Sequence, residues 1–335
     1  MQAAIYGLAG TEITAEERDF FRDARPAGYI LFKRNIVSRQ QLRGLTNALR
    51  DLEGHDEVPI LIDQEGGRVS RMRPPEWPAF PSAEAFDKLY QLAPSSAIEA
   101  ARVNARALGL MLHEAGVNVD CLPMLDVRQP GATDIVGDRA LGSEPMQVAA
   151  LGRAMLDGLR SAGTLGVIKH IPGHGRALVD SHLELPVVNA CEEELVVDLE
   201  PFERLREAPM GMTSHILYTA WDGERPASQS PYIIQEIIRQ RIGFDGLLMS
   251  DDIGMEALAG NHGQRAAACV AAGCDVALHC DGKMENMLLV ADAVGEISAE
   301  GGSRLARAMA MRFTPDDEMD FAEAVSKRDA LLALV

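Results

Sequence analysis

Ionisable residues end or closely follow short apolar runs at five places in this sequence. They are Asp63 after PILI, Asp126 after VDCLPML, Lys169 and His170 at the end of GVIKH, His215 in GMTSHILY, and Asp251 after GLLMS. Carboxylate and imidazole groups can act as nucleophiles, general acids or general bases. Any one of these residues could instead cap a following helix. The repetition over five runs favours a shared reaction pocket.

A second candidate is the segment GHGRALVDSHLELP, which carries Asp180 and His182 two positions apart. The segment begins near Pro172 and is longer than the connection of about 2–6 residues usual between a strand and a helix, and long loops often carry function. A carboxylate beside an imidazole can fix its tautomer and stabilise its protonated form, as an acid/base catalyst requires. The same spacing also suits a hydrogen-bonded turn, so both interpretations stay open.

The adjacent pair Asp251-Asp252 poses a question of register. Successive side chains of a strand point to opposite faces, so Leu247, Met249 and Asp251 share one face. One carboxylate can face the pocket while the other caps the next element. The pattern alone does not say which.

Metal chemistry is the main alternative for the histidines His170, His174 and His182. Metal-dependent barrel hydrolases often carry an HxH pair on the first strand, and the first apolar run here lacks one. Pro172 and Gly173 also interrupt the HxxxH spacing. We therefore expect no catalytic metal and no cofactor.

Strand-like runs alternate with helix-like patterns along the whole chain. The expected strands cover 3–8, 28–32, 59–63, 117–123, 166–170, 211–217, 246–250 and 276–279. The expected helices cover 14–22, 38–52, 97–115, 147–162, 192–206, 231–241, 264–272 and 284–297. Such alternation predicts an α/β protein with a parallel sheet.

Eight strands suit a (β/α)8 TIM-type barrel, in which the strands' C-terminal ends meet on the catalytic face. The alternative is an open doubly wound sheet, whose usual glycine-rich GxGxxG turn is absent after the first strand, where Gly7-Leu8-Ala9-Gly10 stands instead. We expect one barrel domain over 1–335, with a helical tail over about 302–335 packed on it.

Composition bounds the partners and the compartment. The 335 residues are 47% hydrophobic, enough for a sizeable core, and carry a formal net charge of −18, which repels nucleic acid and anionic membranes. Five cysteines without a CxxC pair suit reduced thiols. The start MQAAIYGLAG shows no signal peptide, and no apolar run reaches the roughly 20 residues of a membrane span. We expect a cytoplasmic protein.

Four stretches together carry a family resemblance: IDQEGGRVSRM (62–72), DIVGDRALGSEP (134–145), KHIPGHGRALVDSH (169–182) and MSDDIGMEAL (249–258). With these, the sequence resembles the β-N-acetylhexosaminidases of glycoside hydrolase family 3. The likeness is greatest to the single-domain cytoplasmic enzymes of peptidoglycan recycling. It spans about residues 4 to 300, and the KHxPGHG…DSH combination is its most specific part.

The resemblance implies a role for each matched residue. Asp251 would be the nucleophile of a retaining mechanism, and His182 the acid/base, assisted by Asp180. The sugar would be bound by Asp63, Arg71, Arg139, Lys169 and His170. The implied reaction removes a non-reducing β-1,4-linked N-acetylglucosamine from 1,6-anhydro-N-acetylmuramic acid, with or without attached peptide. The implied partner is thus a small muropeptide, and protein partners are not indicated.

Three rival functions remain open at this point. Family 3 β-glucosidases share the region of the nucleophile but generally carry a second domain that supplies a glutamate acid. A histidine acid/base would also tolerate an incoming phosphate, which permits phosphorolysis. An inactive sugar-binding barrel protein is the third alternative, although both candidate catalytic groups are retained.

Overall fold

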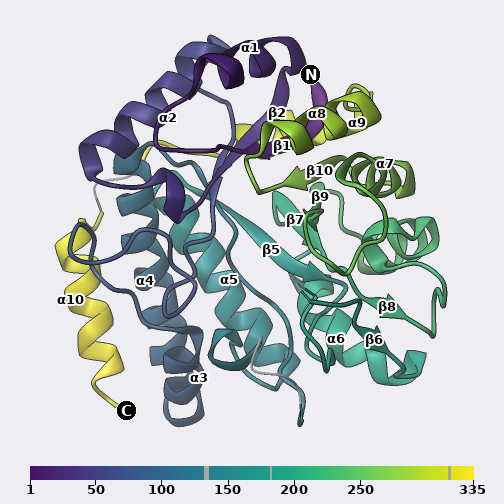
Figure 1. The fold of residues 1–335 in the computed structure, drawn as a ribbon. Helices are drawn as coiled ribbons and strands as arrows, with labels where there is room; N and C mark the ends of the chain where they lie inside the picture. Colours follow the sequence, from purple (N-terminus) through teal and green to yellow (C-terminus); the bar gives the residue numbers. More distant parts are fainter. Residues whose placement is uncertain (132–135, 182, 316–317) are drawn as a thin grey trace.

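The computed structural model describes residues 1–131, 136–181, 183–315 and 318–335. Among these residues, eight parallel strands close a barrel that helices cover from outside (Figure 1). In barrel order they are β1 (Gln2–Gly7), β2 (Pro26–Leu31), β3 (Ile60–Ile62), β4 (Val119–Asp120), β5 (Leu165–Ile171), β7 (Met210–Thr213), β9 (Leu247–Asp252) and β10 (Val276–His279), which pairs with β1. The prediction of a (β/α)8 TIM-type barrel is confirmed.

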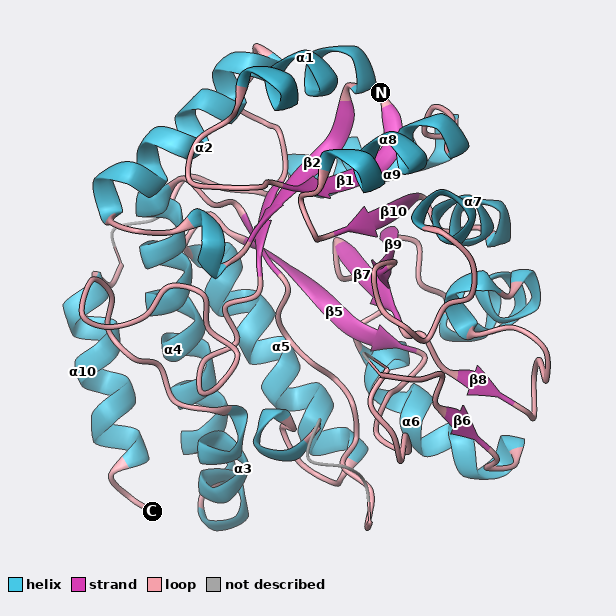
Figure 2. Ribbon diagram, in the orientation of Figure 1, coloured by secondary structure: helices cyan, strands magenta, loops and turns pink. Residues whose placement is uncertain are grey.

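Helices alternate with the barrel strands, as Figure 2 shows by colour. They are α1 (Ala15–Ala24), α2 (Arg39–Glu53), α3 (Ala83–Leu92), α4 (Pro94–Ala115), α5 (Pro145–Ser161), α6 (Glu192–Arg204), the π-helix η4 (Ile233–Ile242), α7 (His262–Ala272), α8 (Met284–Ala293), α9 (Ala299–Ala310) and α10 (Phe321–Leu332). Three short 3-10 turns are η1 (Lys33–Asn35), η2 (Gly137–Arg139) and η3 (Ala227–Gln229).

Several helix ends follow directly from the sequence. In α1, the Thr14 side chain accepts a hydrogen bond from the Glu17 N–H, and the Glu17 carboxylate accepts one from the Thr14 N–H; Asn261 and Gln264 pair in the same way in α7. Such reciprocal caps satisfy backbone donors that the first turn leaves free. Helix α4 ends at Gly116, whose φ of 80° suits a residue without a Cβ.

Some of the predicted elements differ from the structure. The expected strand 211–217 is two strands, because the chain leaves the barrel after β7 and then pairs β8 (Leu217–Tyr218) with β6 (Val187–Val188). Helix α8 ends before Ile297, since the backbone N–H of Ile297 donates to Met1 O and draws that segment to the first strand. Helix α3 was not anticipated.

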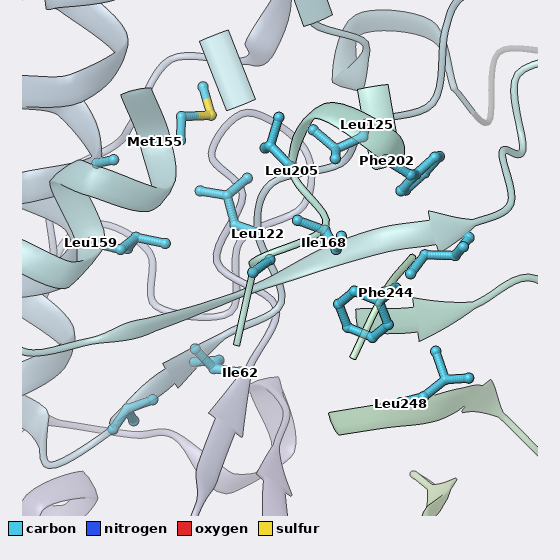
Figure 3. Packing of buried hydrophobic residues seen from close by; sticks show 14 of the residues in the cluster. Ile62, Leu122, Leu125, Met155, Leu159, Ile168, Phe202, Leu205, Phe244 and Leu248 are labelled. Atoms are coloured by element: carbon cyan, nitrogen blue, oxygen red, sulfur yellow. The ribbon is translucent and has the colours of Figure 1, made fainter. Parts of the chain in front are cut away.

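The hydrophobic core has two layers that follow the alternation of the strands. In β9, Leu247 and Met249 point into the barrel lumen, whereas Leu248 points outward. The outward layer packs under α5 and α6, and Figure 3 shows it with Ile62, Leu122, Leu125, Met155, Leu159, Ile168, Phe202, Leu205, Phe244 and Leu248 labelled. The lumen is therefore plugged by side chains, and only its mouth is left for chemistry.

The C-terminal helix α10 lies along α4 (Figure 1). Arg328 of α10 donates to Asn104 Oδ1 at 3.3 Å, and its guanidinium lies 5.3 Å from the Phe80 ring centroid. Just before α10, the Met319 carbonyl accepts from Arg106 Nε at 2.8 Å. Within the described part of the chain, no helix combines the length and the apolar character needed to cross a bilayer.

Candidate active site

A cavity of about 390 Å³ opens at the C-terminal ends of the barrel strands. Its walls come from seven strands or the loops that follow them, and carry Phe32, Asp63, Glu65, Arg71, Asp126, Arg139, Lys169, His170, His174, Asp180, Ser181, Asp251, Asp252, Met255 and Cys280. The cavity thus brings together seven of the eight residues predicted for the site, and the eighth, His182, lies outside the described residues.

Lys169 is the centre of a buried charge network on one wall. Its Nζ lies 3.0 Å from Asp63 Oδ1 and 2.7 Å from Glu65 Oε1. Arg139 clamps Glu65 through two contacts, at 2.7 and 2.9 Å, and Arg71 Nη2 lies 3.0 Å from Asp63 Oδ2. Paired donors of this kind hold a carboxylate in one orientation.

These contacts decide the charge state of the network. Burial alone would raise the pKa of Glu65, but Arg139 and Lys169 outweigh it and hold that pKa below its ordinary value. Burial is likewise outweighed at Lys169, whose pKa is raised by Glu65 and Asp63. Glu65 and Lys169 are therefore both charged at neutral pH. Arg71 Nε is buried and meets no partner among the described residues, so it remains available as a donor to a ligand.

Asp126 orders the second wall. Its Oδ2 lies 2.7 Å from His170 Nδ1, and its Oδ1 accepts the backbone N–H groups of His170 and His174 at 3.2 and 2.6 Å. Since an ionised carboxylate only accepts hydrogen bonds, Nδ1 of His170 carries a proton. Burial lowers the pKa of His174 to about 4, so that imidazole is neutral at physiological pH.

Asp251 lies at the end of β9 on the same face as Leu247 and Met249, and so points into the barrel mouth. Burial would raise its pKa, but His170, His215 and the backbone N–H of Asp252 outweigh that effect and lower the pKa. A buried carboxylate that stays ionised is suited to act as a nucleophile.

Asp252 has a different set of contacts. Its Oδ1 accepts the backbone N–H groups of Gly254 at 2.9 Å and Cys280 at 3.3 Å, which fixes the turn after β9 against the end of β10. Burial raises the pKa of Asp252. The two neighbouring carboxylates are therefore differentiated by register, one toward the cavity and one toward the backbone.

His215 does not reach the cavity, although it belonged to the pattern of five ionisable positions. Its Nε2 lies 3.0 Å from the Asp252 carbonyl oxygen, and its Nδ1 lies 2.7 Å from Ser228 Oγ. Burial lowers the pKa of His215. This side chain supports the backbone beside Asp251 and has no cavity surface.

The loop after β5 closes the remaining side and brings Asp180 and Ser181 to the cavity. Its base is tight: a Cβ at Gly175 would lie 1.9 Å from the Val127 carbonyl oxygen, so only glycine fits. The Gly173 carbonyl accepts from Tyr218 Oη at 2.6 Å. The PGHG sequence thus turns the chain so that the loop rises over the mouth.

Glu65 and Phe32 are among the cavity residues that the sequence prediction did not include. Glu65 follows Asp63 by two positions within IDQEGG, so strand-like spacing could have suggested that both reach the same wall. Phe32 follows β2, lies under the Arg71 guanidinium at 5.2 Å from the ring centroid, and offers no ionisable group to find.

Comparisons with known proteins agree with this geometry. Residues 3–307 match the Glycosyl hydrolase family 3 N terminal domain. A beta-hexosaminidase from Methylococcus capsulatus is 36% identical over 334 residues, covering 98% of this chain and 94% of the relative. Another from Alkalilimnicola ehrlichii is 39% identical over 280 residues, covering 82% of this chain and 79% of the relative.

Solved structures show the same similarity. NagZ from Neisseria gonorrhoeae in complex with N-trifluoroacetyl-D-glucosamine superposes with a TM-score of 0.85 at 28% identity, covering 99% of this chain and 96% of the other. A family 3 beta-N-acetylglucosaminidase from Paenibacillus sp. gives a TM-score of 0.86 at 27% identity, covering 98% of this chain and 66% of the other.

Proposed function

Because this chain belongs to glycosyl hydrolase family 3 and is a glycoside hydrolase of the β-hexosaminidase type, we propose that it is a retaining exo-β-N-acetylglucosaminidase. Its substrate would be a non-reducing, β-1,4-linked N-acetylglucosamine on 1,6-anhydro-N-acetylmuramic acid, with or without peptide. The role would be cytoplasmic peptidoglycan recycling. The observation that carries the proposal is an ionised Asp251 facing the same cavity as the Lys169 network.

Asp251 is proposed as the nucleophile. Attack of its carboxylate on the anomeric carbon would break the glycosidic bond and form a glycosyl ester, which water then hydrolyses with net retention. The lowered pKa keeps this group ionised, and the hydrogen bond from the Asp252 N–H at 2.8 Å orients it. Its neighbour Asp252 is less suited to this role, because the Gly254 and Cys280 N–H groups both hold its Oδ1 toward the turn.

His182 is proposed as the acid/base, with Asp180 as its partner. The imidazole would protonate the departing oxygen and then remove a proton from the incoming water. Asp180 lines the cavity beside Ser181, on the loop wall that faces the strand ends. A carboxylate at this position would orient the imidazole and favour its protonated form.

The charge network is proposed to hold the sugar. Asp63 and Glu65 each keep one fixed orientation through contacts with Lys169, and the acceptor oxygens and N–H donors of the wall can bind sugar hydroxyls. Arg71 retains a buried Nε donor, suited to a carbonyl or hydroxyl oxygen. Because the network is complete before a ligand arrives, binding needs little reorganisation of charges.

The test compares sugars and acceptors. The purified protein should release N-acetylglucosamine from aryl β-N-acetylglucosaminides and from N-acetylglucosaminyl-anhydromuramic acid, with far lower kcat/KM on the matching aryl β-glucoside. Each reaction is run with and without inorganic phosphate, and the product is identified by mass spectrometry. Comparable turnover of the β-glucoside would contradict the sugar preference, a phosphorylated sugar product would indicate phosphorolysis, and no turnover would indicate an inactive binding protein.

A further inference from the structure

A cluster of two histidines and an aspartate lies outside the catalytic cavity. His279 is the last residue of β10, His262 is the first of α7, and Asp281 follows β10 by two positions. The Nε2 atom of His279 lies 3.1 Å from His262 Nδ1 and 3.2 Å from Asp281 Oδ1. Figure 1 shows α7 lying beside β10.

The barrel wall separates this cluster from the cavity. Leu278 and Cys280 flank His279 in sequence, and both line the catalytic cavity. Because side chains alternate along a strand, His279 faces the opposite, outer side. Its ring meets Tyr6 edge-on at 5.9 Å between centroids and is fully buried.

Hydrogen bonds within the cluster cannot give every polar atom of His262, His279 and Asp281 a partner. Nε2 of His279 can carry one proton, yet two atoms with lone pairs approach it. Polar atoms buried without full partners cost stability, and a bound cation would satisfy the three converging lone pairs together.

The spacing of the three side chains is close to that of a tetrahedral metal site. Zinc binds histidine nitrogen and carboxylate oxygen at about 2.0–2.2 Å, which places neighbouring ligand atoms about 3.3–3.6 Å apart. The two distances from His279 Nε2, 3.1 and 3.2 Å, are close to this range, and all three ligand atoms lie within 4.8 Å of one another. A small movement of each side chain would bring both distances into the range of a zinc site.

The carboxylate is already held in one orientation by its neighbours. Asp281 accepts the Lys283 N–H at 2.8 Å on Oδ1 and the Asn286 Nδ2–H at 2.5 Å on Oδ2. Fixing a ligand by outer hydrogen bonds is typical of metal sites.

We propose that His262, His279 and Asp281 form a binding site for a zinc-type divalent cation that fastens the start of α7 to the end of β10. Two imidazoles and one carboxylate favour zinc and its neighbours in the first transition row over magnesium or calcium, which prefer oxygen ligands alone. Asp281 is 25% exposed, so a solvent molecule can complete the coordination. The sequence did not suggest this site, because its ligands are separated by 17 and 2 positions.

The experiment uses the whole chain, stripped with a chelator and titrated with zinc chloride alone by calorimetry. We expect one saturable zinc at this site, and a rise in Tm of about 5 °C at a hundredfold excess over Kd. Cobalt(II) substitution should give the visible absorption of a tetrahedral nitrogen–oxygen site. Magnesium chloride should produce neither change.

Variants locate the ion. His262→Gln and Asp281→Asn should each weaken zinc affinity at this site by about 10²-fold or more and abolish the shift in Tm, because each removes one of three ligands. His113→Gln, which changes a part-buried helical histidine elsewhere, should behave like the parent protein. Asp251→Asn tests the catalytic cavity as the alternative zinc site and should leave both readouts unchanged.

Three outcomes would overturn the proposal. One is the absence of saturable zinc binding. A second is unchanged affinity in both His262→Gln and Asp281→Asn. The third is loss of binding in Asp251→Asn alone, which would place the ion in the catalytic cavity. A zinc-edge anomalous peak between α7 and β10 in crystals would support the site independently of enzymatic activity.

Discussion

The two sides of the catalytic cavity are built in different ways. The strand wall consists of Glu65, Lys169 and Asp251, which are buried, and Asp63, which is half-buried; all are held by ion pairs or backbone hydrogen bonds at the ends of β3, β5 and β9. The loop wall consists of Asp180 and Ser181 in the loop after β5, where Leu178 and Leu183 are 65% and 76% exposed.

This difference separates two tasks that the proposed reaction requires. Sugar binding and attack at the anomeric carbon need groups fixed in position, and a closed barrel supplies that fixity. Proton transfer to the leaving group needs a group near a bulky and variable aglycone, which a surface loop can accommodate. Changes in the strand wall should therefore affect every substrate, whereas changes in the loop wall should depend on the leaving group.

The sharpest test of the strand wall exchanges each of the adjacent aspartates. Asp251→Asn should lower kcat/KM by at least about 10⁴-fold for every leaving group, since the nucleophile is lost. Asp252→Asn keeps an acceptor oxygen for the Gly254 and Cys280 N–H groups and should cost about tenfold or less. A fluorosugar that slows deglycosylation should label Asp251, as located by peptide mass spectrometry. A label on Asp252 would shift the assignment by one residue.

Removing Lys169 tests whether the strand wall is held by charge. Lys169→Met leaves the buried Glu65 and the half-buried Asp63 without their shared cation, and should lower the free energy of unfolding by about 3–5 kcal/mol. Lys88→Met, which removes an exposed pair with Glu84, is the matched control and should change it by less than about 1 kcal/mol. Both are measured by urea unfolding. Equal effects would show that the wall is stabilised by packing alone.

The loop wall should show dependence on the leaving group. His182→Ala should slow release of a sugar leaving group by about 10²–10⁴-fold, yet affect an acidic nitrophenol far less in the glycosylation step. Asp180→Asn should be milder than loss of His182, because the imidazole remains. Pre-steady-state rates with both substrates give the comparison. Equal losses on both would make His182 a structural residue and would remove the distinction between the two walls.

His174, at the base of the loop, should make stability depend on pH. Its folded pKa of about 4 lies below the ordinary value, so the unfolded chain binds the extra proton first as pH falls. The free energy of unfolding is highest above pH 6.5 and falls progressively toward pH 4. The loss due to His174 amounts to about 2 kcal/mol at pH 5. His174→Gln should flatten this part of the stability curve, measured by denaturant unfolding at each pH. An unchanged slope would show that His174 is protonated in the fold.

The sequence was sufficient to predict those features of the fold and the site that follow from one physical rule applied to many residues. Strand–helix alternation predicted the barrel, and the convergence of strand ends predicted that Asp63, Lys169 and Asp251 would meet. His215 was the exception, because both faces of a barrel strand are buried and the apolar pattern does not distinguish lumen from outer face. Its side chain instead bonds the Asp252 carbonyl.

Features that depend on distant partners were harder to predict. The two-residue strands β6 and β8 exist only because Val187 and Leu217 pair across about 30 residues of chain. Helix α3 buries few side chains, chiefly Phe86 and Leu89, so its amphipathic signal is short. The zinc-type cluster likewise needs β10 and α7 to be placed side by side before its ligands converge.

The tight base of the loop has a consequence for how this enzyme can diversify. Gly175 against Val127 fixes where the loop leaves the barrel, and the pairing of Val187 with Leu217 fixes where it returns. The residues between these two anchors can therefore be replaced by a segment of different sequence or length, since changing the length of a loop with anchored ends costs little in closure entropy. Grafting residues 176–186 from a relative should transfer its aglycone preference while Tm changes by only a few degrees. A graft that unfolds the barrel would show that the loop interior also carries stability.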